Sequence, residues 1–373
     1  MINYLFIFFL VFMYGIGGIA ISNIFYYFYA SGNGVNLNKV YLYKSRFIFY
    51  LIFMCWASLS TFSYALFSGN FDGRSLLKYL FIFQYAILII PIAVNKYKFE
   101  LIVYRMVILL SIISSSLFFL LPIHNEGYFD SIEKSWAVGY IPGFPNSVPL
   151  ILIFGLWISF RNNFSVFGKI LIFFCLYLTS SRGAYVIAFF VTLYFIFAKY
   201  ERFINIKLFI SFVFAIVLSL FAAVFYADGI GFLGYFYDLD RLDIYQYSIK
   251  FIELRPIIGY GGNTLDQLHN VNVAYEPIFK WEHTHNWIFE VVLRYGLVGG
   301  LLFFLYLGAV FVSINSFELK FMFFVYIVYA LSQTFMQNFI FIFILSYFAN
   351  YFNINSRENS RAKFLSPHKK GLL

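Results

Sequence analysis

Charged residues are scarce in this chain of 373 residues, where aspartate, glutamate, lysine and arginine together make up only 12%. Hydrophobic residues make up 62% and aromatic residues 24%. An ordinary soluble domain is about half apolar and about a quarter charged. One core in a chain of this length cannot hide so much apolar surface from water. The composition therefore excludes a soluble enzyme, a nucleic-acid-binding protein and a disordered chain, and it predicts a membrane protein.

Cysteine is also rare, since the chain has two, Cys55 and Cys175, and both lie inside apolar runs. This pattern gives no support to a disulfide framework or a zinc site. Charges are nearly absent inside the apolar runs, which argues against a proton-coupled pump. No basic segment precedes the first run, 2–29, so we expect no cleavable signal peptide.

Long apolar runs recur along the whole chain, and a membrane-spanning helix needs about 20 apolar residues. The candidate spans are 2–29, 47–67, 76–94, 101–121, 147–160, 165–180, 184–198, 208–227, 286–314, 319–333 and 339–352. The expected fold class is an all-α polytopic integral membrane protein with about 11 transmembrane helices, within a range of about 10–12.

Basic residues are divided unequally between the two alternating sets of loops. One set has 16 basic and four acidic residues, and the other has nine basic and 13 acidic residues. Basic loops stay in the cytoplasm, so the first set is expected there together with the C-terminus. The resulting organisation is eight transmembrane helices in 1–227, an external loop 228–284, three helices in 285–352 and a basic cytoplasmic tail 353–373. A shorter external loop is expected at 122–146.

Arg182 lies between the apolar runs 165–180 and 184–198. If these runs formed one span, Arg182 would lie near the bilayer centre at a cost of about 2.5–3.5 kcal/mol. A hairpin of two short helices, with its tip at 180–184, avoids this cost and keeps the charge asymmetry. Arg182 is then expected at the external surface, either extending to lipid headgroups or binding the phosphate of a lipid-linked substrate.

The external loop contains a predicted amphipathic helix, 241–254, on the membrane surface. Asp240 is the expected N-cap, and Pro256 is expected to end the helix. Its apolar stripe is Leu242, Tyr245, Ile249 and Ile252. Tyr245 is a candidate for stacking on a sugar, and it also fits an aromatic belt at the membrane interface.

Two arginines lie at opposite ends of this helix. Arg241 occupies the first turn, where backbone N–H groups favour an anion. Arg255 is 14 residues later, about 21 Å along the axis, so the two can hardly hold the same pyrophosphate. Arg255 is a second candidate for substrate binding, but it also suits the C-terminal end of a helix dipole. Residues 259–262 are expected to form a flexible turn.

The segment Glu282-His283-Thr284-His285-Asn286 precedes the long run that carries Glu290, Arg294, Gly296 and Gly299. His285 is expected to open that helix, on the face of Gly296 and Gly299, and it is a candidate general base or an interfacial polar group. His283, Asn286 and Arg294 are further candidates for substrate binding, although Arg294 is also spaced to pair with Glu290. His283 and His285 have no third metal ligand nearby, and we expect neither a metal nor a cofactor.

Three motifs in this order resemble the bacterial O-antigen polymerase and O-antigen ligase superfamily. The resemblance covers 180–300, and the hydropathy pattern extends it over the whole chain. The motifs are Ser181-Arg182-Gly183-Ala184, then Arg241 with Pro256-Ile257-Ile258-Gly259-Tyr260-Gly261, and then His285-Asn286 followed after nine residues by Gly296-Leu297-Val298-Gly299-Gly300. The ligase motif Gly-x-x-Thr-Gly has a threonine where this chain has Gly299, a difference that favours a polymerase.

The resemblance implies a GT-C-like glycosyltransferase architecture in the bacterial inner membrane with a periplasmic active site. It implies a glycan carried on undecaprenyl pyrophosphate and passed to the hydroxyl of another lipid-linked repeat unit. His285 would be the base, and Arg182 and Arg241 would neutralise the pyrophosphate without a metal. Membrane lipids and a chain-length-regulator protein are the other expected partners, and nucleic acid is not.

Two other functions compete with a polymerase. A ligase would pass the same glycan to the lipid A-core. A flippase for lipid-linked oligosaccharides would need two related halves and a charged central cavity, and the sequence indicates neither. We therefore expect a polymerase, with a ligase as the nearest alternative.

The charge asymmetry predicts which loops a thiol reagent can reach. Single cysteines placed at Ser181 and Gly262 should react with a membrane-impermeant reagent from the periplasm, and one placed at Ser360 should not. Reaction of a cysteine at position 360 in intact spheroplasts would contradict the predicted topology. The expected active site would then lie on the cytoplasmic face.

Overall fold

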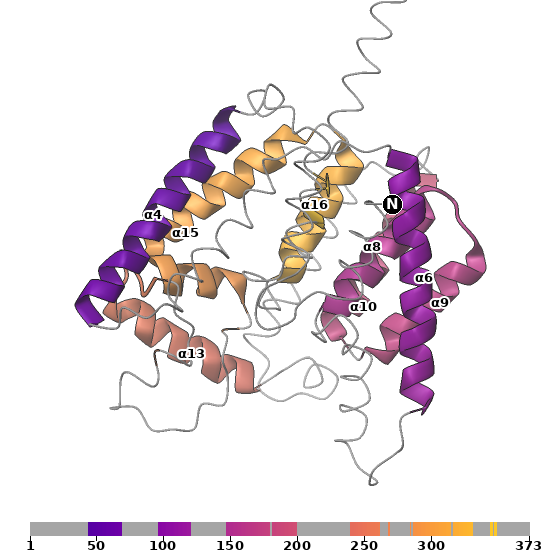
Figure 1. The fold of residues 1–373 in the computed structure, drawn as a ribbon, viewed down its shortest axis with the longest axis horizontal. Coiled ribbons are helices and arrows are strands. Elements are labelled where there is room, and N and C mark those ends of the chain that lie inside the picture. The colour runs from indigo at the N-terminus through magenta and orange to yellow at the C-terminus, as the bar shows by residue number, and fades with distance from the viewer. Residues whose placement is uncertain are drawn as a thin grey trace, which may run out of the picture. The chain divides into compact units, whose positions relative to one another are not determined.

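The computed structural model describes residues 44–68, 96–120, 147–179, 181–199, 239–261, 268, 284, 286–314, 316–330, 344–345 and 347–348. Secondary structure in these ranges is helical, with no strand among them. The helices, drawn in Figure 1, are α4 (Lys44–Ser68), α6 (Lys96–Leu120), α8 (Ser147–Arg161), α9 (Val166–Leu178), α10 (Arg182–Lys199), α13 (Leu239–Leu254), α15 (Trp287–Ser313) and α16 (Phe317–Ala330).

Three of these helices are long and apolar enough to cross a membrane. Their apolar lengths are Ile48–Phe67 in α4, Phe99–Ser116 in α6 and Trp287–Ser313 in α15. The predicted runs 147–160, 165–180, 184–198 and 319–333 also fall on helices. The runs 2–29, 76–94 and 208–227, and most of 339–352, lie outside the described residues. The described residues confirm an all-helical fold with three candidate membrane spans, while the number of spans and the GT-C-like architecture stay predictions.

The chain divides into two compact units, one formed by Met1–Leu101 with Ser248–Leu373 and the other by Ile102–Tyr247. In the second unit, α8 is buried at every position from 148 to 159. A helix that is apolar on all sides suits such a central position. Its neighbours pack closely, because a Cβ added at Gly155 would lie 2.5 Å from the Val107 side chain of α6.

The turn from α8 to α9 is a C-terminal helix cap that the sequence dictates. Asn163 adopts a left-handed conformation with φ 51°, which asparagine tolerates better than most residues. The N–H of Phe164 donates to the carbonyl of Ser159 (2.9 Å), and the N–H of Asn163 donates to that of Phe160 (3.2 Å). This pair of bonds is the Schellman motif, which satisfies the last carbonyls of the helix.

The predicted separation of 165–180 from 184–198 is found in the structure. Helix α9 ends at Leu178 and α10 begins at Arg182. The hydroxyl of Tyr185 donates to the carbonyl of Tyr177 (2.7 Å). In a continuous helix these residues would be about 12 Å apart along the axis, so the chain turns sharply between them.

In the first unit, α4 and α15 lie side by side along most of their length (Figure 1). Aromatic contacts run in opposite order along the two helices: Tyr50 contacts Tyr306, and Phe53 contacts both Phe303 and Tyr295. The helices are therefore antiparallel, which is the relative orientation that the charge asymmetry predicts for these two spans.

The same two helices each expose an apolar face. Leu59, Phe62 and Leu66 are 48–61% exposed on α4, and Leu297 and Leu301 are about 60% exposed on α15. A protein in water rarely exposes such continuous apolar surface. Lipid is the solvent that these faces fit, in agreement with the membrane assignment.

Helix α13 confirms that the predicted segment is helical but corrects its start, and its place on the membrane surface stays a prediction. It begins at Leu239, so Asp240 lies in its first turn and is not the N-cap. The face that packs against protein is Ile244, Ser248 and Phe251, whereas Ile249 of the predicted stripe is 41% exposed, which leaves that face open to the membrane. A surface helix next to lipid needs two apolar faces, and the sequence pattern alone does not tell which of them meets protein.

Candidate functional site

Helix α15 is interrupted at Gly296, which has φ 70° and ψ −179°. In an uninterrupted helix each carbonyl accepts from the N–H four residues later. The interruption removes these partners from the carbonyls just before it, and buried carbonyls without partners cost free energy. The predicted face shared by His285, Gly296 and Gly299 is therefore wrong, because the chain between them is not one regular helix.

The turn that follows α13 supplies some of the missing partners. The N–H of Tyr260 donates to the carbonyl of Leu293 (3.0 Å), and the N–H of Leu297 donates to the carbonyl of Pro256 (2.7 Å). We call residues 256–261 the anchored turn. The flexible turn predicted at 259–262 overlaps it, but Gly259, Tyr260 and Gly261 are buried, and the N–H groups of Gly259 and Tyr260 donate to the carbonyls of Arg255 and Leu293.

Side chains of α4 supply the rest. The hydroxyl of Ser60 lies 2.6 Å from the carbonyl oxygen of Ile258 and 3.0 Å from that of Arg294, and its single proton serves both. The indole N–H of Trp56 donates to the carbonyl of Tyr295 (2.8 Å). Helix α4, the anchored turn and both halves of α15 thus form one hydrogen-bonded junction.

Two glycines make this close approach possible. Gly259 and Gly296 both have positive φ, and their backbones face each other. A Cβ at Gly296 would lie 1.9 Å from the carbonyl oxygen of Ile257, and one at Gly259 would lie 2.5 Å from the nitrogen of Gly296. No side chain fits at either position without displacing backbone.

The Gly296→Ala variant should therefore unfold more readily, by at least about 2 kcal/mol, because strained φ and a backbone clash add together. The matched control is Gly308→Ala in the same helix, where an added Cβ meets nothing within 4 Å. That change should be neutral or stabilising by up to about 1 kcal/mol. Thermal unfolding in detergent measures both, and equal midpoints for the two variants would contradict the assigned role of the interruption.

Removal of the Ser60 hydroxyl provides a second test of the junction. Ser60→Ala leaves two carbonyls short of a donor and should cost about 1–3 kcal/mol. Thr61→Val is the control, because the Thr61 hydroxyl donates within α4 to the carbonyl of Ala57. If both variants unfold at the same temperature, Ser60 does not hold the junction together.

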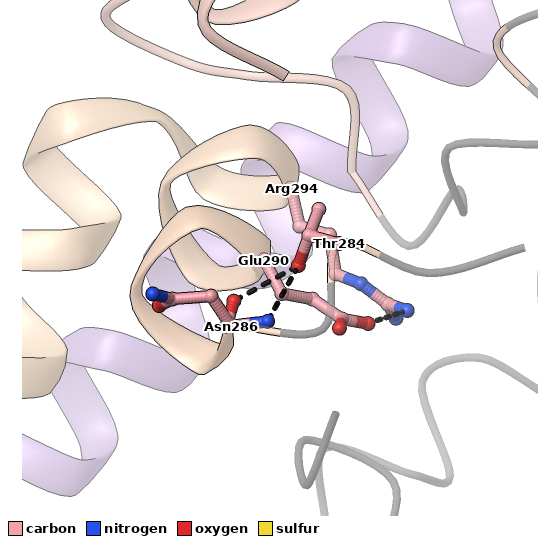
Figure 2. Close-up of polar contacts among 4 residues, drawn as sticks. All are labelled: Thr284, Asn286, Glu290 and Arg294. Atoms are coloured by element: carbon pink, nitrogen blue, oxygen red, sulfur yellow. Dashed lines mark hydrogen bonds and ion pairs between the residues drawn. The ribbon is translucent and has the colours of Figure 1, made fainter. Parts of the chain in front are cut away.

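The N-terminal end of α15 is capped by Asn286, as Figure 2 helps to follow. Its side-chain oxygen accepts from the N–H groups of Ile288 (2.9 Å) and Phe289 (3.4 Å), and Thr284 donates to its carbonyl (2.9 Å). Asparagine is among the best N-cap residues. The helix thus begins at Trp287, two residues after the predicted start at His285, and the Asn286 side chain is engaged in capping.

Glu290 and Arg294 form the predicted ion pair one turn apart (Figure 2). Their side chains are only 3% and 5% exposed. The second carboxylate oxygen of Glu290, Oε2, is buried and has no hydrogen-bond partner among the described residues. Removing either partner of a buried ion pair strongly destabilises a protein, because the remaining charge stays buried without its partner. Both residues therefore contribute to the stability of the folded site. Whether Arg294 also binds substrate stays a prediction.

Arg255 lies just after α13 with its guanidinium against two tyrosine rings. The guanidinium carbon is 5.2 Å from the ring centre of Tyr64 on α4 and 5.5 Å from that of Tyr260. Burial raises the pKa of Tyr260 to about 12, although the charge of Arg255 opposes the shift. Tyr260 is therefore neutral at physiological pH, and its hydroxyl donates to the carbonyl of Phe251 (3.1 Å).

The other predicted site residues are described less fully. The backbones of Arg182 and Arg241 lie in the first turns of α10 and α13, but their side chains fall outside the description, as do His283 and His285. Tyr245 is partly exposed on α13. Within the described ranges, no three histidine, cysteine, aspartate or glutamate residues lie together as metal ligands.

Sequence reasoning missed the contribution of α4. In the anchored turn, Ser60 bonds to Ile258 and Tyr64 contacts Tyr260. Trp56 bonds to Tyr295 of α15. The spacing of four places these three α4 residues on one face of an otherwise apolar span. Polar groups repeating at that interval in a membrane helix were the available signal.

Comparison with known proteins finds a family model that matches the part of the chain containing the anchored turn and Gly296. Residues 167–304, less than half of the chain, match the family model described as O-antigen ligase. The matched range includes Arg182, Arg241, the anchored turn, His285 and Gly296, so the resemblance to the O-antigen ligase and polymerase superfamily is confirmed. No curated protein matches the chain. Together with the apolar helices, the match supports a membrane protein of lipopolysaccharide biosynthesis.

Proposed function

We propose, with that superfamily match as the premise, that the chain is an O-antigen polymerase in the bacterial inner membrane. It would transfer a glycan from undecaprenyl pyrophosphate to the non-reducing-end hydroxyl of another lipid-linked repeat unit at the periplasmic face. The observation that carries the proposal is the family match over 167–304, because it includes all three motifs in their order. The glycine at position 299, where ligases have threonine, favours a polymerase over a ligase.

The proposed chemistry assigns one role to each motif. His285 takes the proton of the acceptor hydroxyl while the acceptor oxygen bonds to the anomeric carbon. The bond from that carbon to the phosphate oxygen breaks with inversion, and the pyrophosphate leaves on its lipid. Arg182 and Arg241 neutralise the negative charge that develops on the leaving group, a task suited to the guanidinium fork. No nucleotide is needed, because the lipid carrier supplies the activation, and no metal is needed, because the two arginines neutralise the pyrophosphate.

The junction around Gly296 supports this assignment because it joins α13, which carries Arg241, to α15, which follows His285. The anchored turn closes the C-terminal end of α13, the helix whose first turn holds Arg241. It bonds to α15, the helix that His285 precedes by two residues. Catalytic groups need to be held within fractions of an ångström, and a hydrogen-bonded junction of three elements suits that need.

A ligase is the second candidate, favoured by the description of the matched family. The two activities share the donor and differ in the acceptor. The surface polysaccharide of a deletion strain separates them. Lipid A-core capped with a single repeat indicates loss of a polymerase. Lipid A-core without repeats, together with accumulated lipid-linked polymer, indicates loss of a ligase.

Complementation of that strain tests the residue roles. Arg182→Lys, Arg241→Lys and His285→Ala should each insert normally and lose the ladder of long chains. Lysine keeps the charge but loses the planar fork, and loss of a general base costs about 10²–10⁴-fold in rate. Arg105→Lys, an exposed position on α6, is the matched control and should keep the ladder. A normal ladder from His285→Ala at matched protein level would remove the proposed base.

A further inference from the structure

Within the described part of the chain, the guanidinium of Arg255 makes none of the hydrogen bonds by which a capping arginine satisfies the end of a helix. A capping arginine donates to the last carbonyls of its helix. Among the residues that the structure describes, the carbonyls of Phe251 and Ile252 accept instead from the N–H of Arg255, at 3.3 and 3.2 Å, and Phe251 also accepts from Tyr260. The guanidinium of Arg255 donates to none of these carbonyls and pairs with no described carboxylate.

Two tyrosine rings fix this guanidinium. Tyr64 and Tyr260 pack edge to face with ring centres 5.6 Å apart, and the guanidinium lies against both rings, each ring centre within about 6 Å of the cation, the range in which aromatic rings attract it. Tyr260 is fixed in turn by its backbone bond to Leu293 and by an edge-to-face contact with Phe251 at 5.7 Å. The cation is therefore positioned before any ligand binds, while its N–H donors have no partner among the described residues.

The position of Arg255 restricts the ligand. Tyr64 lies in the last turn of the apolar length Ile48–Phe67, so the guanidinium is at the level where this span ends. The neighbouring side chains Leu254 and Ile257 are 65% and 61% exposed and apolar. A planar cation with unused donors, next to apolar side chains at the end of a span, fits an anion that is attached to a lipid.

We propose that Arg255 binds a phosphate group of a membrane lipid at the outer end of α4. Arg241 lies 14 residues earlier, in the first turn of α13, about 21 Å away along the axis of that helix, so the two arginines bind different phosphates. A polymerase uses two pyrophosphate-linked lipids, a donor and an acceptor. If the phosphate belongs to such a carrier, Arg255 holds the second one, and this identification rests on the function proposed above.

Binding of lipids to the purified full-length protein in nanodiscs tests the proposal. The probes are undecaprenyl pyrophosphate and phosphatidylglycerol, each titrated against a neutral phosphatidylcholine background. Arg255→Gln should weaken binding of at least one probe by about 10- to 100-fold, because it removes charge-assisted hydrogen bonds. Lys250→Gln removes one exposed charge from the same helix and should change binding by less than about threefold.

The two probes distinguish the source of the phosphate. Weakening of undecaprenyl pyrophosphate binding identifies the carrier lipid, and weakening of phosphatidylglycerol binding alone identifies an ordinary headgroup. Unchanged binding of both probes by Arg255→Gln would overturn the proposal. If the unaltered protein binds no undecaprenyl pyrophosphate at all, the proposed polymerase function fails, and the phosphatidylglycerol titration still decides the role of Arg255.

A second pair of variants keeps the test independent of how Arg255→Gln folds. Tyr64→Leu removes a ring that positions the guanidinium, whereas Tyr64→Phe keeps the ring and removes only the hydroxyl. Binding should weaken several-fold more in Tyr64→Leu than in Tyr64→Phe. Equal binding by these two variants, at equal thermal stability, would show that the rings do not position a phosphate-binding group.

Discussion

The interruption of α15 at Gly296 is the constraint on which the rest of the described site depends. A membrane helix cannot leave backbone carbonyls without partners, because lipid offers no hydrogen bonds. The carbonyls of Leu293, Arg294 and Tyr295 are satisfied by three different sources: the anchored turn, Ser60 and Trp56. This requirement fixes α4 beside α15, and it explains why Gly259 and Gly296 bear no side chain.

The interruption also links the apolar helices α4 and α15 to the turn that follows α13. Irregular backbone within a membrane protein is tolerated where it is buried in protein or lines a cavity, and broken helices often mark binding sites. Here the broken helix bonds to the turn that ends α13 and holds Arg255. Arg255, the Glu290–Arg294 pair and the Asn286 cap therefore lie on segments that share one hydrogen-bonded junction. The anchored turn is thus an integral part of the fold.

Periodicity and charge predicted much of this structure from the sequence. Apolar runs located α4, α6, α15 and the short helices, and the cost of burying Arg182 predicted the break between α9 and α10. The pair of Glu290 with Arg294 followed from their spacing. The interruption at Gly296 was not predicted, because an apolar run with four glycines fits a regular helix equally well. The partners on α4 are more than 190 residues distant in sequence, and only the polar spacing of Trp56, Ser60 and Tyr64 indicated them.

The most direct test of the account is a cell-free reaction with purified protein and synthetic undecaprenyl-pyrophosphate-linked repeat units. We predict lipid-linked products with two or more repeats and the release of one undecaprenyl pyrophosphate for each bond formed. The reaction should proceed without lipid A-core. Products that appear only when lipid A-core is added would indicate a ligase. Failure to release undecaprenyl pyrophosphate with either acceptor, by protein that is folded and monodisperse, would contradict the proposed glycosyl transfer.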